Sequence, residues 1–225
     1  MTEQDLSLMN DPFLLLPANL SELARAAARG HAFRPAMQGV YVEVCEDEYE
    51  AAATDGRQLA VVRGRATADP LSFPPCDALA ALPPSRDSAV VPKDEWQKAF
   101  RSAPKGRDAA GAGLVAVHLG ESAAVLCTSD GEAEQSRRVP NADGQFPNYR
   151  AVLPTQEPAV RIQFDPAYLL NLVWLADHFA AERYDGGRVT LEVFAPDKPM
   201  VLRSGTAEQQ FIGLLMPMVL ESRST

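Results

Sequence analysis

The sequence has no apolar run that approaches the ~18–20 residues needed to cross a bilayer. Its first ten residues are acidic and contain neither the basic nor the apolar region of a signal peptide. Cysteine is scarce, and Cys45, Cys76 and Cys127 are far apart, which argues against a disulfide framework and against a zinc cluster. Together with 46% apolar and 23% charged residues, these absences predict a soluble, cytoplasmic globular protein.

Motifs of common catalytic and nucleotide-binding sites are also missing. The chain contains no G-x-S-x-G, no Walker A loop and no G-x-G-x-x-G after a strand. His31, His118 and His178 are scattered along the chain without metal-type spacing to a cysteine. We therefore predict no enzyme activity, no catalytic residue, no metal site and no cofactor.

The net charge of -9 conceals two segments in which basic residues outnumber acidic ones. Arg25 and Arg29 are four positions apart, and Lys98 and Arg101 are three apart, so each pair shares one face of a helix. Such faces are either ordinary solvated helix surfaces or a basic surface suited to phosphate contacts. Charge alone does not choose between the two interpretations.

One arrangement of elements occurs three times along the chain. Apolar strands begin near Phe13, Ala89 and Val160, and each is followed by a Pro or Asp cap and then a helix. Short β-type runs follow each helix, with Gly or Asp clusters between them, as in antiparallel meanders. We predict an α+β fold with antiparallel sheets and helices on one face. The predicted βαβββ repeats span residues 13–66, 87–146 and 158–221.

The repeated arrangement of strands and helices also predicts which residues form the core and which connect the repeats. The Pro-rich residues 69–84 are predicted to connect the first two repeats. Both tryptophans, Trp96 and Trp174, are assigned to the core rather than to a ligand site. The other apolar helix positions assigned to the core are Leu20, Leu23, Phe100, Leu169, Leu172 and Val173. Later strands are expected at 39–44, 49–54, 58–62, 113–119, 123–127, 188–194, 199–203 and 209–215, with a weaker run after Glu132.

Three segments resemble, in the same order, motifs of the bacterial DNA polymerase III β sliding clamps. Residues 53–61, A-T-D-G-R-Q-L-A-V, resemble the family's A-T-D-G-H-R-L-A-V. Residues 146–154, F-P-N-Y-R-A-V-L-P, are similar to F-P-D-Y-R-R-V-L-P. Residues 214–220, L-L-M-P-M-V-L, resemble the C-terminal V-V-M-P-M-R-L. The resemblance covers about residues 13–220.

This resemblance implies a DNA clamp fold, in which pairs of βαβββ repeats form domains and domains join into a ring around duplex DNA. Residues 11–153 would form one complete clamp-like domain, and residues 158–221 would correspond to the C-terminal half-domain. The helices would line the channel. The residues expected to contact double-stranded DNA without sequence preference are Arg25, Arg29, Lys98 and Arg101. The third helix region, residues 165–185, is acidic and would line a channel poorly.

The resemblance also implies an apolar pocket that receives short peptide motifs from polymerases and other partners. The residues carried over by position are Thr54, Gly56, Leu59, Pro147, Val152, Leu214, Met216 and Met218. Packing between repeats is the alternative role of these side chains. The chain also departs from the family, because Arg57-Gln58, Ala151 and Val219 replace its His-Arg and two of its arginines.

Bacterial clamps carry six such repeats per chain, whereas this sequence carries three. A lone third repeat would expose a sheet edge and an apolar helix face, so we expect a homo-oligomer. The expected function is that of a sliding clamp-like processivity factor, which tethers a polymerase or repair protein to DNA. The alternative is a clamp-like interaction module that keeps the pocket without encircling DNA, as an adaptor, decoy or inhibitor of replication. The basic first two helices favour the former, and the acidic third helix region favours the latter.

Overall fold

A computed structural model describes most of the chain, which divides into two compact units. Unit 1 comprises Met1–Leu153 and unit 2 comprises Pro154–Thr225. Within these units the described residues are 13–30, 34–45, 48–65, 73–80, 82, 85–105, 111–180, 188–206 and 209–218. None of the helices in these ranges is long and apolar enough to cross a membrane.

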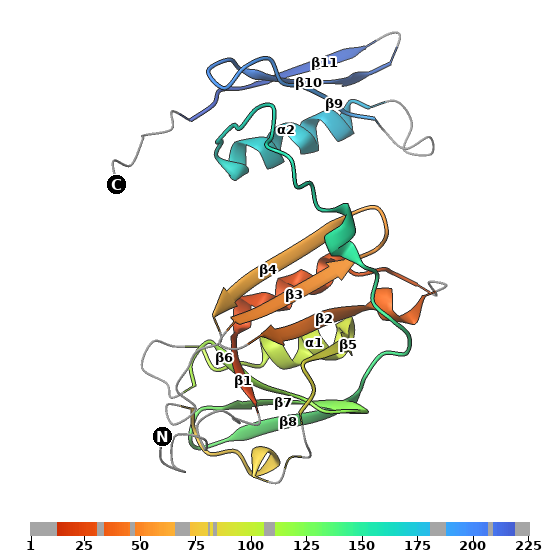
Figure 1. Cartoon of the computed structure of the whole chain (residues 1–225). Coiled ribbons are helices and arrows are strands. Elements are labelled where there is room, and N and C mark those ends of the chain that lie inside the picture. The colour runs from red at the N-terminus through yellow and green to blue at the C-terminus, as the bar shows by residue number, and fades with distance from the viewer. Residues whose placement is uncertain are drawn as a thin grey trace, which may run out of the picture. The chain divides into compact units, whose positions relative to one another are not determined.

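Unit 1 contains the first two predicted repeats (Figure 1). The elements of the first repeat are β1 (Leu14–Pro17), η2 (Ala18–Ala26), η3 (Pro35–Gln38), β2 (Gly39–Cys45), β3 (Glu48–Thr54) and β4 (Leu59–Arg65). Those of the second are β5 (Ser88–Pro92), α1 (Lys93–Arg101), β6 (Leu114–Leu119), β7 (Ala123–Ser129) and β8 (Glu134–Pro140). The short η6 (Tyr149–Val152) follows. The strands predicted for both repeats are confirmed, and the first predicted helix forms as 3-10 turns.

The two repeats of unit 1 exchange their first strands. One sheet has the order β1-β6-β7-β8 and the other has the order β4-β3-β2-β5. β1 therefore pairs with β6 of the second repeat, with Leu15 opposite Ala116, and β5 pairs with β2 of the first, with Val90 opposite Tyr41. Both pairings are antiparallel. This reciprocal exchange relates the two repeats by an approximate two-fold axis.

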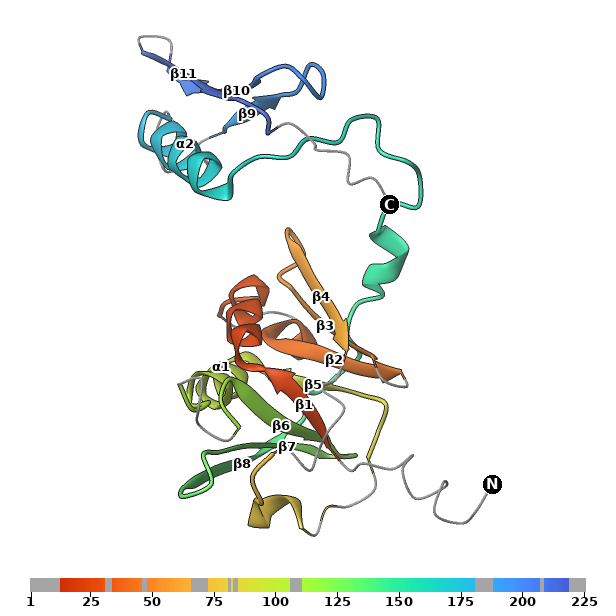
Figure 2. The same ribbon diagram turned by 90° about the vertical axis from the view of Figure 1, so that its left-hand side faces the viewer.

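The helices η2 and α1 lie side by side on one side of the two sheets (Figure 2). Trp96 of α1 is fully buried and stacks on Phe100, with 4.0 Å between ring centroids. Its indole Nε1 donates a hydrogen bond of 2.8 Å to the backbone oxygen of Leu20 in η2. One apolar cluster includes these residues together with Val42 and Val117 from the two sheets. The two repeats thus share a single core, and the prediction of Trp96 as a core residue is confirmed.

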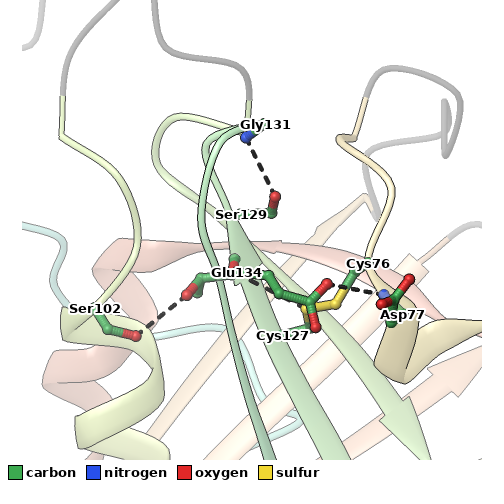
Figure 3. The surroundings of a disulfide bond; sticks show 8 residues. Cys76, Asp77, Ser102, Cys127, Ser129, Gly131 and Glu134 are labelled. Carbon is green, nitrogen blue, oxygen red and sulfur yellow. Dashed lines mark hydrogen bonds between the residues drawn. A yellow bond between two sulfur atoms is a disulfide. The ribbon is translucent and has the colours of Figure 1, made fainter.

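A disulfide joins Cys76 and Cys127, which the expectation that the cysteines form no disulfide framework did not anticipate (Figure 3). The two residues are 51 positions apart, but the Pro-rich connector folds back onto β7. Beside the disulfide, the backbone N–H of Asp77 donates a hydrogen bond of 2.8 Å to Glu134 Oε2 of β8. Asp77 begins the short helix η5 (Asp77–Leu79) within the connector, part of which lies outside the described residues. The expectation rested on the separation of the cysteines along the sequence. That separation does not determine how close two residues lie in the folded chain.

Unit 2 contains one helix packed on one sheet. Its elements are α2 (Pro166–His178), β9 (Thr190–Glu192), β10 (Met200–Gly205) and β11 (Gln210–Leu215), and the sheet order is β11-β10-β9. Asp165 caps α2 by accepting a hydrogen bond of 2.8 Å from the N–H of Ala167. Ser204 Oγ of β10 donates a hydrogen bond of 2.6 Å to the backbone oxygen of Ala176 on α2. Phe179, the C-cap residue, stacks on Phe211 of β11, with 5.8 Å between centroids.

Two predictions for the third repeat are wrong. The strand expected from Val160 is reduced, within the described residues, to an isolated bridge between Gln163 and Met218. Trp174 was assigned to the core, but 64% of its surface is exposed, and Val173 is exposed as well. The physical reason is common to both. In unit 1 a neighbouring repeat pairs with the first strand and covers the outer side of the helix, whereas unit 2 contains one repeat only.

Candidate functional site

The turn between β3 and β4 holds the first of the three motifs in a defined conformation. Thr54 is buried; its hydroxyl donates a hydrogen bond of 2.6 Å to the backbone oxygen of Gln58 and accepts one of 3.0 Å from the N–H of Gly56. Asp55 Oδ1 accepts hydrogen bonds of 2.9 Å from the N–H groups of Arg57 and Gln58, which hold the pKa of this carboxyl below its usual value. Gly56 has φ 87°, a left-handed conformation that favours glycine.

The second motif packs against the first within unit 1. Phe146 and Tyr149 are buried in a cluster with Val90, and Leu59 of β4 packs against that cluster. Tyr41 of β2 stacks on Phe146, with 5.1 Å between centroids. The structure therefore brings residues of the A-T-D-G and F-P-N-Y motifs together, as the resemblance implies. Packing and peptide contact are compatible roles for Leu59, because it is only partly buried.

Two other predicted pocket residues in unit 1 are more accessible. Pro147 is half-buried and lines a cavity of about 580 Å³, together with Tyr41 and Asn148. Val152, at the end of η6, is 72% exposed. Its exposure leaves it free of the core cluster that holds Tyr149. Val152 thus has an accessible apolar surface, which a contact residue for a partner requires.

A charged network fixes the second motif to the sheet. Glu43 and Glu50 are directly opposite each other in the β2–β3 register, and Arg150 donates hydrogen bonds to both, at 2.6 Å in the case of Glu50. Glu50 also accepts hydrogen bonds from the hydroxyl of Tyr149 and from Arg63. The guanidinium of Arg150 lies 5.1 Å from the centroid of the Tyr149 ring. Two facing carboxylates would repel each other, so the arginine between them stabilises this arrangement.

The network shifts the pKa values of its members. Burial acts to raise the pKa of Glu50, but hydrogen bonds from Tyr149 and Arg63 and the charge of Arg150 outweigh it, so that the pKa is lowered. Burial, and then the hydrogen bond to Glu50, raise the pKa of the Tyr149 hydroxyl. The sequence did not predict this network. The signal that could have found it is the pair of glutamates that a β-hairpin places opposite each other.

The third motif lies in unit 2, at the end of β11. Leu214, Met216 and Met218 are 63%, 66% and 57% exposed, respectively. The backbone N–H of Met218 donates a hydrogen bond of 2.8 Å to the oxygen of Gln163, which holds the residues after β11 in place. Flexible methionine side chains adapt to apolar ligands of different shapes. The three residues therefore form an exposed apolar surface in unit 2.

The four predicted DNA contacts lie on or beside the paired helices of unit 1. Arg25 and Arg101 both form ion pairs with Glu22, at 3.4 and 3.3 Å, which places them close together although they belong to different repeats. Lys98 pairs with Glu95 at 2.6 Å. Exposed ion pairs of this kind contribute little to stability and exchange readily for other partners. Arg29 is exposed beyond the end of η2.

Between these helices lies an open cleft of about 840 Å³. Its lining includes Asn19 and Glu22 of η2, Arg101 of α1, and Lys105 and Gly113 beyond α1. Two cations and one carboxylate thus face the cleft, and it offers polar surface along the helix pair. The acidic residues Glu182 and Asp185 of the third helix region lie outside the described residues.

Similarity to known proteins is evident in structure and not in sequence. No family model matches the chain, and no curated protein matches it. The DNA polymerase sliding clamp of Bacillus subtilis superposes with a TM-score of 0.67 at 17% identity, covering 91% of this chain and 49% of that chain. The chain has the sliding-clamp fold. The resemblance inferred from three short motifs and the predicted α+β clamp architecture are thereby confirmed.

Other solved sliding clamps show the same extent of similarity. The clamp of Pseudomonas aeruginosa has a TM-score of 0.67 at 17% identity, covering 96% of this chain and 54% of that chain. The DNA polymerase III β chain of Streptococcus pneumoniae has a TM-score of 0.65 at 16% identity, covering 93% and 50%, respectively. The chain spans about half the length of these clamps. At such identities the similarity concerns the sliding-clamp fold and leaves the function to be argued from the site.

Proposed function

We propose that the chain is a non-enzymatic, sliding clamp-like factor of DNA replication or repair, which tethers a polymerase or repair protein to duplex DNA. The observation that carries this proposal is the pair of helices in unit 1. Arg25 and Arg101 come from different repeats and meet at Glu22, on the side of the fold where both helices lie. The solved structures that share the fold are themselves named DNA polymerase sliding clamps.

Contact with DNA would run through the phosphates. Arg25, Lys98 and Arg101 are exposed on two neighbouring helices, and Arg29 is exposed beyond the end of η2, so the four could approach a backbone without contacting base edges. Phosphate contacts carry no sequence information and weaken as salt rises. The remainder of the chain is acidic enough to give a net charge of -9, which disfavours DNA on the other surfaces. Weak binding confined to one surface suits a protein that slides.

Charge reversal on α1 tests the DNA contact. We expect the double variant Lys98→Glu/Arg101→Glu to bind two duplexes of unrelated sequence more weakly, and to the same degree. The slope of log K against log salt should decrease by about 2, because two phosphate contacts are lost. The measurement is fluorescence anisotropy across a salt series. Arg188→Glu/Lys198→Glu is the control, since it changes the net charge equally at two exposed positions of unit 2. Unchanged binding by the α1 variant would remove these residues from the interface.

For peptide partners, we propose that the eight residues from the three motifs provide apolar contacts, those of the first two motifs in unit 1 and those of the third in unit 2. Support comes from the ordered turn at Gly56, from Leu59 beside the Tyr149 cluster, and from the exposed side chains of Met216 and Met218. Gln58, Ala151 and Val219 stand where the family motifs carry arginines, although Arg57 and Arg150 are present, which predicts weaker binding of acidic peptides.

Truncation of one anchor tests these contacts. Met216→Ala should weaken binding of a Leu/Phe-containing clamp-binding peptide by about 1–3 kcal/mol, the usual effect of losing a buried contact. Isothermal titration calorimetry measures this change. Ile212→Ala is a matched control because Ile212 is an equally apolar, exposed residue of β11 outside the motif. An unchanged affinity for Met216→Ala would exclude Met216 from these contacts.

A second candidate function is a clamp-like interaction module that does not encircle DNA. The observation in its favour is that α2, unlike the helices of unit 1, exposes apolar residues such as Leu170 and Trp174. Such a module would bind the peptide but show no salt-sensitive affinity for duplex DNA. The DNA titration therefore separates the candidates, since only the clamp-like factor binds duplex DNA and responds to charge reversal on α1, whereas both candidates bind the peptide.

A further inference from the structure

Helix α2 is apolar on two sides and covered on only one. Leu172 and Ala176 face the sheet of unit 2, where Leu172 approaches Gly213 and Ala176 is fully buried. Leu170, Val173 and Trp174 recur at helical spacing on the other side, and Leu170 and Trp174 are 69% and 64% exposed. A helix with apolar residues on both sides is normally buried on both. Contiguous exposed apolar surface of this kind marks an interaction site.

Unit 1 shows which helix positions meet at the rim of a complete pair of repeats. Glu22 lies five residues after the N-cap of η2, Pro17, and Arg101 lies nine residues after the N-cap of α1, Pro92. These two side chains meet across the helix pair at 3.3 Å. Positions five and nine after an N-cap are thus contact positions between the helices of paired repeats.

The same two positions in unit 2 are occupied by the exposed apolar residues. Leu170 lies five residues and Trp174 nine residues after Asp165, the N-cap of α2. At these two positions unit 1 has an exposed pair of opposite charges, whereas unit 2 has a leucine and a tryptophan. These two side chains complement each other without any like-charge contact, so one copy of α2 can pack on another.

The sheet of unit 2 is incomplete on the corresponding side. In unit 1 the first strand after each helix, β2 or β6, pairs with a strand donated by the other repeat. The corresponding strand of unit 2, β9, is the last of its sheet among the described residues. Leu191 of β9 faces the same side of the sheet as its register partner Leu202, yet it is 51% exposed where Leu202 is buried. An open strand edge beside exposed apolar side chains invites a further strand.

We propose that unit 2 pairs with unit 2 of a second copy of this chain about a two-fold axis. Leu170 packs on the partner's Trp174, and the reverse contact forms at the same time, as an isologous interface requires. Residues 160–164 of each copy pair antiparallel with β9 of the other, just as β5 and β1 do between the repeats of unit 1. The pair is a complete clamp-type domain assembled from two chains. It depends on neither DNA nor peptide binding.

The arrangement of unit 1 indicates that a second copy of the chain covers the exposed side of α2 and the open edge of β9. Apart from η3 in the first, the two repeats of unit 1 have the same element order, exchange equivalent strands and pack equivalent helices. Unit 2 contains one further repeat of that order, with its helix-contact positions and its strand edge both exposed. An identical repeat supplies the missing helix and the missing strand in a single symmetric contact. A short peptide would supply only one of them.

Mass measurements on the full chain test the proposal. We expect light scattering or sedimentation to show a concentration-dependent dimer. Trp174→Glu and Leu170→Glu should each raise its dissociation constant at least about tenfold, because a charge would enter an apolar contact. Ile212→Glu is the control, since Ile212 is a similarly exposed residue of unit 2 on the sheet face away from α2. Circular dichroism verifies folding, which exposed positions on α2 should leave intact.

Cross-linking then identifies the geometry. In a Cys45→Ser background, which removes the free exposed cysteine, a mixture of Leu170→Cys and Trp174→Cys chains should oxidise to more cross-linked dimer than either chain alone. A monomer at every concentration overturns the proposal. So does a dimer that neither glutamate weakens, or a mixed cross-link no stronger than the self cross-links. None of these measurements contains DNA or peptide, so their failure is distinct from failure of the proposed function.

Discussion

The two tryptophans of this chain occupy helices of the same repeat type and end in opposite environments. Trp96 of unit 1 is fully buried between Phe100 and the backbone of Leu20, whereas Trp174 of unit 2 is mostly exposed and stacks on His178 of its own helix, with 5.7 Å between centroids. A βαβββ repeat by itself covers one side of its helix. The other side is covered only when a second repeat contributes a neighbouring helix.

The largest expected difference between the units concerns these tryptophans. Trp96→Ala should lower the free energy of unfolding of unit 1 by about 3–5 kcal/mol, because it empties a buried site and removes the hydrogen bond to Leu20. Trp174→Ala should change the stability of monomeric unit 2 by less than about 0.5 kcal/mol. Hydrogen exchange resolved by segment in a denaturant series measures both. Equal losses of unfolding free energy in the two units would contradict the conclusion that the two tryptophans lie in opposite environments.

Unit 1 also contains the disulfide, and unit 2 contains no cysteine. Replacing Cys76 and Cys127 together by serine should destabilise unit 1 by about 4 kcal/mol, the loop-closure entropy of a bridge across 51 positions. Unit 2 should be unaffected, and Cys45→Ser is the control for loss of a free thiol. Denaturant unfolding with and without a reductant provides the measurement. If a reductant does not lower the free energy of unfolding of the wild-type protein, the disulfide does not stabilise unit 1.

A smaller effect is expected from pH, again in unit 1 alone. The pKa of Glu50 lies below the ordinary 4.5, so its contribution to stability is complete above that pH and is lost as pH falls through the lowered value. Glu50→Gln should cost about 1–3 kcal/mol at neutral pH and flatten the acid dependence of unit 1. Tyr149→Phe removes one hydrogen bond to Glu50 and should shift the loss of stability to higher pH. Urea titrations between about pH 3 and pH 7, the range over which carboxyl groups titrate, measure the stability of both variants.

Much of the fold could be predicted because its signals are local. Alternating apolar residues and the Asp55-Gly56 turn indicated β3, β4 and the hairpin between them, and the structure confirms these elements. Of the candidate site, the resemblance implied the residues of an apolar pocket, which stay a prediction; the structure adds that Leu59 packs against the cluster containing Tyr149. The network at Glu50 was not predicted. Arg150 of this network lies 100 positions from Glu50, and nothing in the local sequence marks Arg150 as a partner of Glu50.

By itself the sequence determined the number of repeats, the order of strands and helices, and the exposure of the basic residues on η2 and α1, because each depends on neighbours within a few positions. Only the tertiary structure decided the disulfide between Cys76 and Cys127, the exchange of β1 and β5, and the exposure of Trp174. These features depend on which segments pack together after the chain has folded back on itself. An apolar side chain predicts that something will cover it, and only the packed structure shows whether its own chain does so.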